Sequence, residues 1–238
     1  MRRILSRVRA AVSDYEMIKD GDKIAVGVSG GKDSLMLLKV LCELKRFHSE
    51  KFELVAITLD MRFNNVDGDF SEIKKMCDEY GVEYVVKPTD LYEIIFNIRK
   101  EQSPCSLCSR MRRGILHDTA KELGCNKIAL GHHLDDAAET FMMNLLIESR
   151  IGCFAPVTYL SRKDITMIRP LVYVREREIE QSLERVDLPI IKSGCPANEH
   201  TKREDAKILL KELSKEYGDV PERIVGALQR GEIDRWGK

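Results

Sequence analysis

A loop that combines two glycines, two serines, a lysine and an aspartate occupies residues 29–34, where the sequence is Ser-Gly-Gly-Lys-Asp-Ser. It follows Lys23–Val28, a short apolar run typical of a strand, and it leads into Asp33–Leu44, whose apolar residues recur at helical spacing. Glycines let the backbone turn tightly and approach a ligand, and a helix N-terminus offers N–H groups to an anion. Lys32 adds a positive charge and the serine hydroxyls add hydrogen-bond donors. The combination predicts a phosphate-binding loop.

This loop is neither of the two commonest nucleotide-binding motifs. A Walker A loop has glycine six residues before the lysine and serine or threonine after it, but here those positions hold Val26 and Asp33. The spaced glycines of a dinucleotide-binding loop are also absent from this stretch. An ordinary turn between a strand and a helix would explain the glycines, but not the lysine, the aspartate and the two serines together.

A second polar loop, Gly-His-His-Leu-Asp-Asp over residues 131–136, follows the expected strand Lys127–Leu130. Because the carboxyl ends of parallel strands share one edge of a sheet, we expect both loops at that edge. Asp135 and Asp136 open an expected helix that runs to about Glu148. The two carboxylates could cap that helix, bind Mg²⁺ against phosphates or act as a general base, and the residue types alone leave these roles open.

Two cysteines three residues apart, Cys105 and Cys108, are spaced so that both can reach one metal centre. The pair could be half of a zinc site, a redox pair or a chance occurrence. A thioredoxin-like pair is disfavoured, because that motif lies beside the first strand of its fold and this pair follows the third. A zinc site needs further ligands, for which the candidates are Cys195, Cys153, His117 and His200.

Expected strands and helices alternate through the first two thirds of the chain. Further strands are expected at Glu53–Leu59 and Val82–Lys87, and a hairpin at Val157–Leu160 and Ile165–Ile168. Strands alternating with helices indicate βαβ units and predict a parallel, doubly wound sheet. The remaining helices are expected at Ser71–Tyr80, Leu91–Ile98, Arg110–Leu123, Arg175–Val186 and Thr201–Tyr217.

The composition is that of a folded protein with a well-solvated surface. The 238 residues are 43% hydrophobic and 33% charged, with 39 basic and 39 acidic side chains, which excludes a disordered chain. No apolar run approaches the roughly 18 residues of a membrane span, and the basic N-terminus is followed by no apolar segment of a secretory signal. The seven cysteines argue for thiols or metal ligands, so we expect a cytoplasmic location. The chain divides into a basic helix (1–20), a nucleotide-binding domain (21–174) and a helical region (175–238).

Two clusters of basic residues interrupt the balanced charge. The first lies in the N-terminal segment and contains Arg2, Arg3, Arg7 and Arg9. The second surrounds the cysteine pair and contains Arg99, Lys100, Arg110, Arg112 and Arg113. Each could be a solvated helix face or a contact for nucleic-acid phosphates, and the position beside the cysteines favours nucleic acid for the second.

Three motifs resemble those of one enzyme superfamily. Ser-Gly-Gly-Lys-Asp-Ser resembles the PP-loop of the ATP pyrophosphatases, which include GMP synthetase, lysidine synthetase and tRNA thiolases. Gly-His-His-Leu-Asp-Asp resembles a second signature of lysidine synthetases and tRNA thiolases. Pro-Cys-Ser-Leu-Cys-Ser-Arg-Met-Arg-Arg-Gly closely resembles the central motif of the tRNA 2-thiocytidine synthetase family. One departure is Cys195, which lies in Gly-Cys-Pro-Ala-Asn-Glu-His and not in a second segment with two cysteines.

The resemblance implies an α/β fold of the adenine nucleotide alpha hydrolase-like type, with a parallel doubly wound sheet and a small helical C-terminal extension. It implies ATP, Mg²⁺ and a [4Fe-4S] cluster as cofactors and tRNA as partner. The residues implied to bind ATP are Val28, Ser29, Gly30, Gly31, Lys32, Asp33, Ser34, Asp60, Gly131 and His132. The residues implied to act in catalysis are Lys32, Asp135 and Asp136. The implied cluster ligands are Cys105, Cys108 and Cys195, and the expected tRNA contacts are Arg110, Arg112 and Arg113.

The implied activity is ATP-dependent tRNA thiolation. ATP adenylates the C2 oxygen of a cytidine, expected at anticodon-loop position 32, and sulfur delivered at the open iron of a three-cysteine cluster then replaces that oxygen. A cysteine desulfurase is an expected sulfur donor, and the family suggests a homodimer. The alternatives are a lysidine-type ligase, a thiolase of another tRNA position or of a small molecule, and a non-catalytic RNA- or nucleotide-binding protein with structural zinc.

Overall fold

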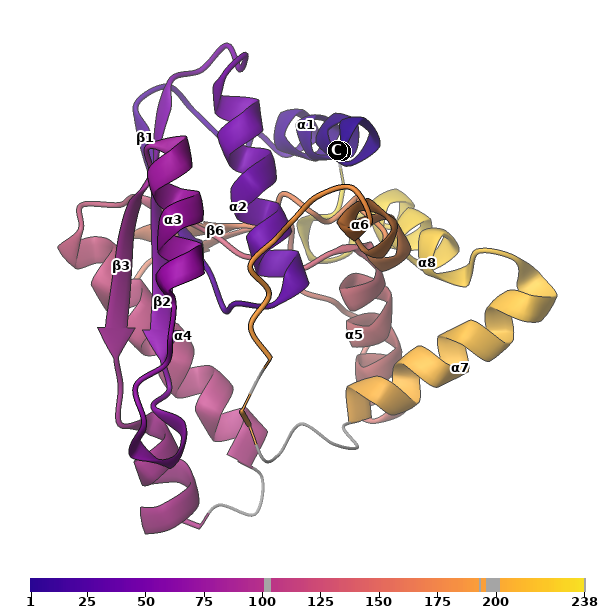
Figure 1. Ribbon diagram of the computed structural model, residues 1–238. Helices are drawn as coiled ribbons and strands as arrows, with labels where there is room; N and C mark the ends of the chain where they lie inside the picture. The colour runs from indigo at the N-terminus through magenta and orange to yellow at the C-terminus, as the bar shows by residue number, and fades with distance from the viewer. Residues whose placement is uncertain (101–103, 193, 196–201, 238) are drawn as a thin grey trace.

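A six-stranded sheet forms the centre of the computed structural model, which describes residues 1–100, 104–192, 194–195 and 202–237. The strands are β1 (Asp22–Gly27), β2 (Phe52–Asp60), β3 (Glu83–Pro88), β4 (Lys127–Ala129), β5 (Val157–Leu160) and β6 (Ile165–Ile168). Their order is β3-β2-β1-β4-β6-β5, and neighbours are parallel except for the antiparallel pair β5–β6. Figure 1 shows the parallel arrows of β2 and β3 side by side. The structure therefore confirms the predicted parallel sheet and the predicted hairpin.

Helices cover both faces of the sheet, as expected for a doubly wound fold. They are α1 (Arg2–Asp14), α2 (Lys32–Lys45), α3 (Ser71–Tyr80), α4 (Pro104–Glu122), α5 (Leu134–Leu146), α6 (Glu176–Leu183), α7 (Lys202–Tyr217) and α8 (Val220–Arg230), with short turns η1 (Phe63–Asn65), η2 (Glu93–Ile98) and η3 (Ile233–Arg235). Successive residues of a strand face opposite ways. Ile24 and Val26 therefore lie in the core shared with α1, α2 and α3, whereas Ala25 packs against Leu116 and Ala120 of α4 on the other face. None of the helices in the described part of the chain is long and apolar enough to cross a membrane.

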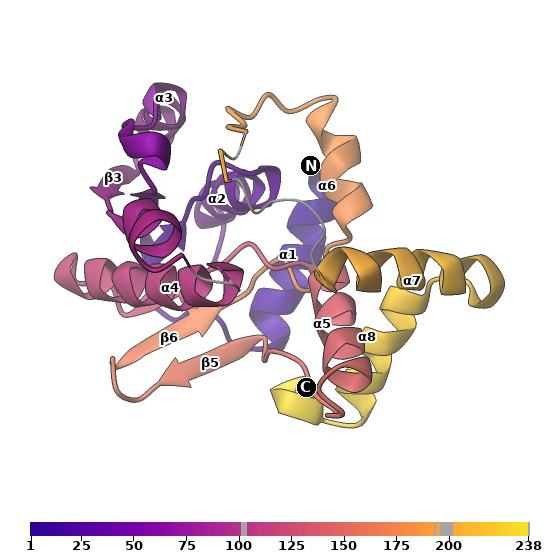
Figure 2. The same ribbon diagram turned by 90° about the horizontal axis from the view of Figure 1, so that it is seen from below.

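The strand order reverses direction between β1 and β4. From β1 the chain builds outward through β2 and β3, and it then returns to place β4 on the other side of β1. In sheets of this kind, ligands bind outside the carboxyl ends of the strands at such a reversal. The loops that follow β1 and β4 both leave the sheet here, so the fold brings together two polar motifs that are about 100 residues apart in sequence. Figure 2 views the molecule from this edge.

Both ends of the chain pack into the core of the sheet domain. Val8 of α1 and Trp236 near the C-terminus belong to the same buried cluster as Ile24 of β1. Trp236 is fully buried, and its indole N–H donates a hydrogen bond to the carbonyl of Phe154 at 2.8 Å. The three-segment division expected from the sequence stays a prediction, and the outer segments share the core of the middle one.

Three helical elements differ from the sequence-based expectation. α4 begins at Pro104 and not at Arg110, so the cysteine pair lies in its first turns. The helix expected at Leu91–Ile98 is present over those residues, but from Glu93 to Ile98 its turns are of the π type. α8 has no counterpart among the expected elements, although its start signals are present. The side chain of Asp219 accepts the N–H of Glu222, and a proline lies in the first turn.

Candidate active site

The glycine loop is held open by its own serines. Gly30 has φ of +83°, a left-handed conformation that favours glycine, and Gly31 is the extended residue before α2. The hydroxyl of Ser34 donates to the carbonyl of Gly31 at 2.9 Å and accepts the N–H of Ser29 at 3.1 Å. Val28 ties the loop to β2, because its N–H donates to the carbonyl of Ile57 at 2.8 Å. These hydrogen bonds fix the shape of the loop, and the first N–H groups of α2 are directed at its mouth.

Lys32 is held at the loop by a carboxylate that the sequence analysis did not single out. Its ammonium lies 2.8 Å from Oε1 of Glu176, at the start of α6, and 3.3 Å from Oδ2 of Asp33. The other oxygen of Glu176 lies 2.7 Å from Nζ of Lys207 on α7. Burial by itself would raise the pKa of Glu176, but the hydrogen bonds and charges of the two lysines lower it to about 2. Glu176 is therefore an anion that aligns two cations beside the phosphate loop.

Asp33 presents an oxygen suited to a metal ion. Its Oδ1 is buried and has no hydrogen-bond partner among the described residues. Burial raises the pKa of Asp33, although the charges of His133 and Lys32 oppose the rise. An unpartnered carboxylate oxygen is a ligand type that Mg²⁺ prefers, so this residue fits the Mg²⁺ that accompanies a bound nucleotide.

The second loop touches the first through Gly131. A Cβ atom at this position would lie 3.2 Å from the carbonyl carbon and oxygen of Asp33 and from the nitrogen of Ser34. A side chain would therefore push against backbone that cannot turn aside. Glycine at this position lets the two loops approach each other backbone to backbone.

The paired aspartates are both engaged within the protein. Oδ2 of Asp136 accepts the N–H of His133 at 2.9 Å, while Nδ1 of His133 accepts the N–H of Asp136 at 3.2 Å, which makes a reciprocal cap on α5. Asp135 accepts two hydrogen bonds from the Arg175 guanidinium at 2.8 and 3.0 Å and one from the N–H of Glu176 at 2.6 Å. The capping role that the sequence left open is thus present at Asp136, and Asp135 anchors the start of α6.

A buried polar group lies behind the aspartates. The ring of His132 stacks at a tilt on Phe154 with 5.2 Å between centroids, and burial lowers the pKa of His132 to about 4, so the imidazole is neutral. Glu139, which is 4% exposed, lies 3.2 Å from Arg203 of α7. Burial and the nearby charge of Asp136 raise the pKa of Glu139 to about 7 against the opposing charge of Arg203.

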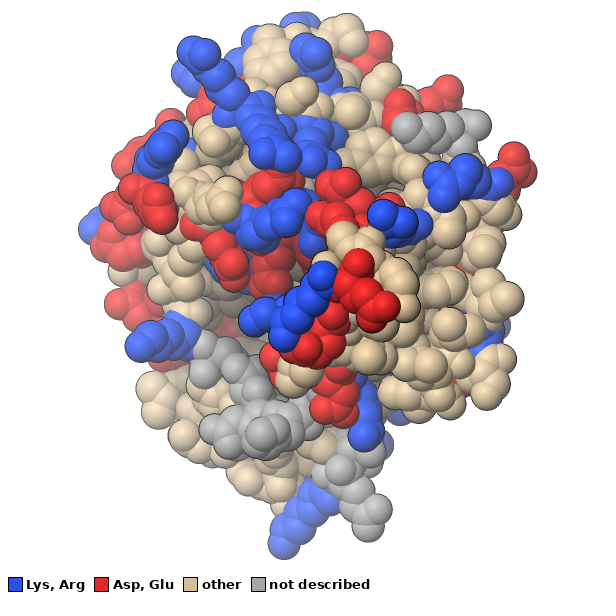
Figure 3. All heavy atoms as spheres, turned by 90° about the vertical axis from the view of Figure 1, so that its right-hand side faces the viewer, with Lys and Arg blue, Asp and Glu red and all other residues tan. Residues whose placement is uncertain are grey.

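Helix α7 places two basic side chains at this edge of the sheet. Arg203 and Lys207 are four residues apart and so lie on one face of the helix. Arg203 contacts Oδ1 of Asp136 at 3.1 Å, and Lys207 contacts Glu176. Basic and acidic side chains interleave on the face shown in Figure 3, consistent with these ion pairs. Arg175, Glu176, Arg203 and Lys207 belong to no motif in the sequence, and the one signal for any of them is the four-residue spacing of Arg203 and Lys207.

Asp60 braces the loop after β2. It lies at the carboxyl end of that strand, next to β1, and is 6% exposed. Its two oxygens accept the N–H groups of Arg62 at 2.9 Å and Gly68 at 3.0 Å. Asp60 therefore lies at the same sheet edge as the phosphate loop, where its carboxylate fixes loop geometry.

The three cysteines expected to bind a cluster are neighbours. Burial raises the pKa of the Cys108 thiol; Arg112 opposes the rise, and the nearby Cys195 and Cys105 add to it. Within the described residues, no three His, Cys, Asp or Glu side chains are already assembled as a metal site. Cys105, Cys108 and Cys195 nevertheless lie within reach of one another's charge, and thiols are the donor type that suits an iron–sulfur cluster.

The alternative zinc ligands lie elsewhere or outside the described residues. Cys153 is buried in the main core, where its thiol donates to the carbonyl of Ala137 at 3.3 Å. Nε2 of His117 is buried on α4 without a hydrogen-bond partner among the described residues. His200 lies outside the described residues. Neither Cys153 nor His117 is among the groups with the largest effect on the pKa of the Cys108 thiol.

The two basic clusters differ in their surroundings. Arg110, Arg112 and Arg113 are exposed on α4 beside the cysteine pair. In the N-terminal cluster, by contrast, Arg3 and Arg7 form ion pairs with Glu178 of α6 at 2.5 and 3.1 Å. These two arginines therefore join α1 to α6, whereas the arginines of α4 face solvent near the thiols.

Similarity to known proteins defines the class. The family described as the PP-loop domain matches residues 2–205. The structure of the U34-tRNA thiolase NcsA from Methanococcus maripaludis, which contains a [4Fe-4S] cluster, is similar with a TM-score of 0.74 and 27% identity, covering 94% of this chain and 77% of that one. An NAD+ synthetase from Burkholderia pseudomallei, 13% identical with a TM-score of 0.53, shares the fold over 97% of this chain and 89% of its own. The chain is a PP-loop protein, and the predicted fold class is confirmed.

The sequence relatives define the family more narrowly. A tRNA-cytidine(32) 2-sulfurtransferase from Geobacter sulfurreducens is 41% identical over 230 residues, which are 95% of this chain and 89% of the relative. The same enzyme from Dechloromonas aromatica is 37% identical over 225 residues, 94% of this chain and 78% of the relative. This chain belongs to the tRNA-cytidine(32) 2-sulfurtransferase family. The expected family and the expected enzyme class, an ATP-using sulfurtransferase, are confirmed.

Proposed function

We propose that this protein replaces the C2 oxygen of a cytidine in tRNA, at anticodon-loop position 32, with sulfur in an ATP-dependent reaction. The observation that carries the proposal is the meeting of two chemistries at one sheet edge. The phosphate loop lies there, and the thiols of Cys105 and Cys195 are close enough to Cys108 for their charges to raise its pKa, which supports a cysteine site next to that edge. A lysidine-type ligase has use for the first feature but not for the second.

The first step activates the base. The C2 carbonyl oxygen attacks the α-phosphorus of ATP, an O–P bond forms, and the bond to the β-phosphate breaks to release pyrophosphate. The N–H groups at the start of α2 and the Lys32 ammonium stabilise the charge that develops on the leaving pyrophosphate. Glu176 keeps Lys32 and Lys207 aligned and protonated, because its negative charge and hydrogen bonds raise the pKa of both lysines against the effect of burial.

Mg²⁺ would be held by Asp33, whose buried Oδ1 has no other partner among the described residues. A bound divalent ion screens the phosphate charges as pyrophosphate departs. Asp136 lies close enough to Asp33 for its charge to raise the pKa of that carboxyl. One oxygen of Asp136 caps α5, and the other would join the ion only by exchanging its contact with Arg203.

The second step exchanges oxygen for sulfur. Cys105, Cys108 and Cys195 would hold a [4Fe-4S] cluster, which supplies sulfide at its one iron without a protein ligand. A C–S bond forms at C2, the C–O bond to the adenylate breaks, and AMP departs with the former base oxygen. Carbon does not change oxidation state when sulfide is the incoming species, so the exchange itself needs no reductant. Sulfur supplied as a persulfide must first gain two electrons from a thiol reductant, which is oxidised to a disulfide, to reach the sulfide level.

The tRNA would lie along the exposed arginines of α4. Arg110, Arg112 and Arg113 are exposed in the first half of α4 beside the thiols, where they would neutralise phosphates. The target base must be unstacked before its C2 atom can reach the site, which favours a base in a single-stranded loop. A cysteine desulfurase is the proposed supplier of sulfur, and a homodimer is the proposed assembly, to be checked by light scattering of the purified protein.

Nucleoside mass spectrometry of tRNA tests the proposal, comparing a strain that lacks this protein with its parent. Loss of 2-thiocytidine is the expected result. Loss of a different thionucleoside would retain the mechanism and change the target, whereas an unchanged profile would contradict tRNA thiolation. Iron and acid-labile sulfide in the protein purified without oxygen separate a thiolase from a lysidine-type ligase and from a zinc-bearing binding protein.

A further inference from the structure

Helix α7 reaches the phosphate loop through one lysine. Nζ of Lys207 lies 2.7 Å from Oε2 of Glu176, and Oε1 of the same carboxylate lies 2.8 Å from Nζ of Lys32. The two ammonium groups therefore lie on either side of one carboxylate. Lys207 is just beyond residues 2–205, the part of the chain that matches the PP-loop domain, so the loop motif supplies Lys32 but not this second cation.

The position of α7 does not depend on Lys207. Ala206 and Leu210 are buried, with 7% and 3% of their surface exposed. One turn before Lys207, Arg203 lies 3.1 Å from Oδ1 of Asp136 on α5, and Figure 2 shows the start of α7 against α5. The side chain of Lys207, by contrast, is 46% exposed. The helix is therefore held by apolar packing and by Arg203, and the ammonium of Lys207 can be reached by a ligand.

The charges along this edge of the loop alternate in sign. In order they are Asp33, Lys32, Glu176 and Lys207, joined by contacts of 3.3, 2.8 and 2.7 Å. Burial would lower the pKa of Lys207, but the hydrogen bond and charge of Glu176 raise it, so the ammonium is charged at neutral pH. Once Asp33 binds Mg²⁺, Glu176 is the carboxylate left between two ammonium groups, and the surplus positive charge suits a phosphate.

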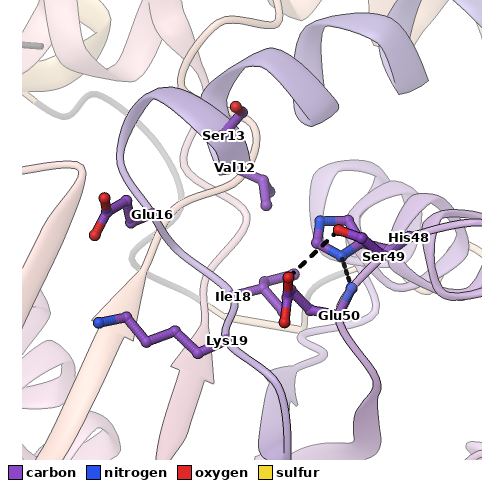
Figure 4. Close-up of a pocket in the computed structure, with 8 residues that line it drawn as sticks. All are labelled: Val12, Ser13, Glu16, Ile18, Lys19, His48, Ser49 and Glu50. Carbon is purple, nitrogen blue, oxygen red and sulfur yellow. Dashed lines mark hydrogen bonds between the residues drawn. The ribbon is translucent and has the colours of Figure 1, made fainter.

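Two surface hollows in the described part of the chain lie at the other edge of the sheet. They surround the end of α1 and the turn at 47–50, with volumes of about 410 and 540 Å³. Figure 4 shows the smaller one, where Nδ1 of His48 accepts the N–H of Glu50 at 3.1 Å. Because the lining residues Ile18 and Lys19 precede β1, this hollow lies at the amino edge. A ligand in it would not reach the phosphate loop.

We propose that Lys207 contacts the pyrophosphate part of ATP and, together with Lys32, stabilises it as it leaves. The inference rests on the proposed function, because pyrophosphate departs in the adenylation step. In that step the bond between the α-phosphorus and the oxygen that bridges to the β-phosphate breaks, and its electron pair goes to pyrophosphate. A cation placed where this charge develops lowers the barrier.

The geometry of the two lysines matches the shape of that leaving group. An ammonium has three N–H donors, and Glu176 is the ion-pair partner of Lys207 in the described part of the chain, so donors remain for phosphate oxygens. Pyrophosphate consists of two phosphate groups joined through one oxygen. Two ammonium groups on either side of one carboxylate can each donate to one of those phosphates, and such charge-assisted bonds are about twice as strong as neutral ones.

Calorimetry with inorganic pyrophosphate and Mg²⁺ tests the contact, because this binding needs neither tRNA nor a cluster. Lys207→Ala should weaken the binding of pyrophosphate to the full-length protein about tenfold. The affinity of the same variant for AMP should be unchanged, because AMP lacks the β- and γ-phosphates. In turnover with tRNA and saturating ATP, the variant should release pyrophosphate about tenfold more slowly than the wild type.

Matched variants separate a phosphate contact from a general loss of charge. Lys207→Arg keeps the positive charge and should retain most of the affinity for pyrophosphate. Lys211→Ala removes the same charge one turn further along α7, where the side chain is exposed, and should bind pyrophosphate like the wild type. Far-ultraviolet circular dichroism and the melting temperature of each variant confirm that it is folded.

The outcomes separate this inference from the function on which it rests. Equal affinity for pyrophosphate in Lys207→Ala and the wild type would overturn the contact while leaving the thiolase intact. An equal loss of affinity for pyrophosphate and for AMP would also overturn it, because the substitution would then have disturbed the whole site. The same loss in Lys211→Ala would assign the effect to the charge of α7 in general and would likewise overturn it. A wild-type protein that binds neither pyrophosphate nor an ATP analogue would contradict the proposed function itself.

Discussion

Replacing Gly131 with alanine tests whether the two loops at the carboxyl edge must meet backbone to backbone. The new Cβ would lie 3.2 Å from three backbone atoms of Asp33 and Ser34, closer than nine in ten real Cβ contacts. Those atoms belong to the first turn of α2 and cannot rotate away, so one loop must shift by a few tenths of an ångström. Overpacking of this kind costs about 1–3 kcal/mol. The reduced entropy of the unfolded chain returns about 0.5–1 kcal/mol, which leaves a net loss of about 1–2 kcal/mol.

The expected readouts are stability and nucleotide affinity together. For a chain of this length each kcal/mol shifts the melting temperature by about 2–4 °C, so Gly131→Ala should melt about 2–8 °C below the wild type. The displaced N–H groups of α2 should weaken binding of an ATP analogue about tenfold in calorimetry. Gly114→Ala is the control, because a Cβ at this helical position meets nothing within 4 Å, and it should stabilise by about 0.5–1 kcal/mol. Unchanged melting and affinity in Gly131→Ala would refute the reasoning that the loops abut.

Four further predictions address the charges and thiols of the site. Lys32→Ala should abolish tRNA-dependent pyrophosphate release while the fold persists, and release at the wild-type rate would contradict the role of the lysine. Cys195→Ser should lose iron and acid-labile sulfide with little change in melting temperature; retained cluster and activity would exclude Cys195 as a ligand. Arg112→Ala combined with Arg113→Ala should reduce the slope of log affinity for tRNA against log salt by about one for each phosphate that is no longer neutralised, and an unaltered slope would assign the pair to a solvated face. The pKa of Glu176 is lowered to about 2 from an ordinary 4.5, so its carboxylate stabilises the fold above about pH 4.5 and this stabilisation is lost as the pH falls toward 2. Glu176→Gln should therefore lower the free energy of unfolding at pH 7 by about 2–3 kcal/mol and flatten its pH dependence in that acid range. If the free energy of unfolding of the variant fell with acid as steeply as that of the wild type, the ion pairs of Glu176 with Lys32 and Lys207 would not stabilise the fold.

Local sequence patterns were sufficient for most of the sheet. β1, β2 and β3 lie within one residue or two of the expected positions, because apolar, β-branched runs between glycine-rich or polar turns have few alternatives. The helix over 71–80 was also expected with the observed bounds, since Gly81 ends it with φ of +63°. Predicting α4 depended on weaker signals. The segment around Pro104 carries no apolar periodicity, so its helical start was not visible before the structure placed it.

The candidate site divides in the same way. The phosphate loop was predictable from its own six residues, because glycine conformation and the helix N-terminus act within a few residues of each other. The roles of Asp135 and Asp136 were not, because a carboxylate can cap, pair or bind metal according to which distant groups face it. The structure brings Arg175 to Asp135 and Arg203 to Asp136, across 40 and 67 positions of sequence. Those residues carried no motif of their own.

The sequence by itself predicts the chemical groups available to this protein. They are a phosphate-binding loop, a pair of carboxylates and a set of thiols beside arginines, on a parallel sheet. These follow from residue types and spacings that act locally, over a turn or a single strand-to-helix junction. How the parts are joined depends on the tertiary structure. The reversal of strand order between β1 and β4 sets the two loops against each other at Gly131, and the path of the chain after α6 lays Ile191 across Gly30 on the way to Cys195. Contacts between residues about 100 or more positions apart depend on packing of the whole core. Local patterns therefore predicted that the two loops share an edge of the sheet, but not which residues touch there.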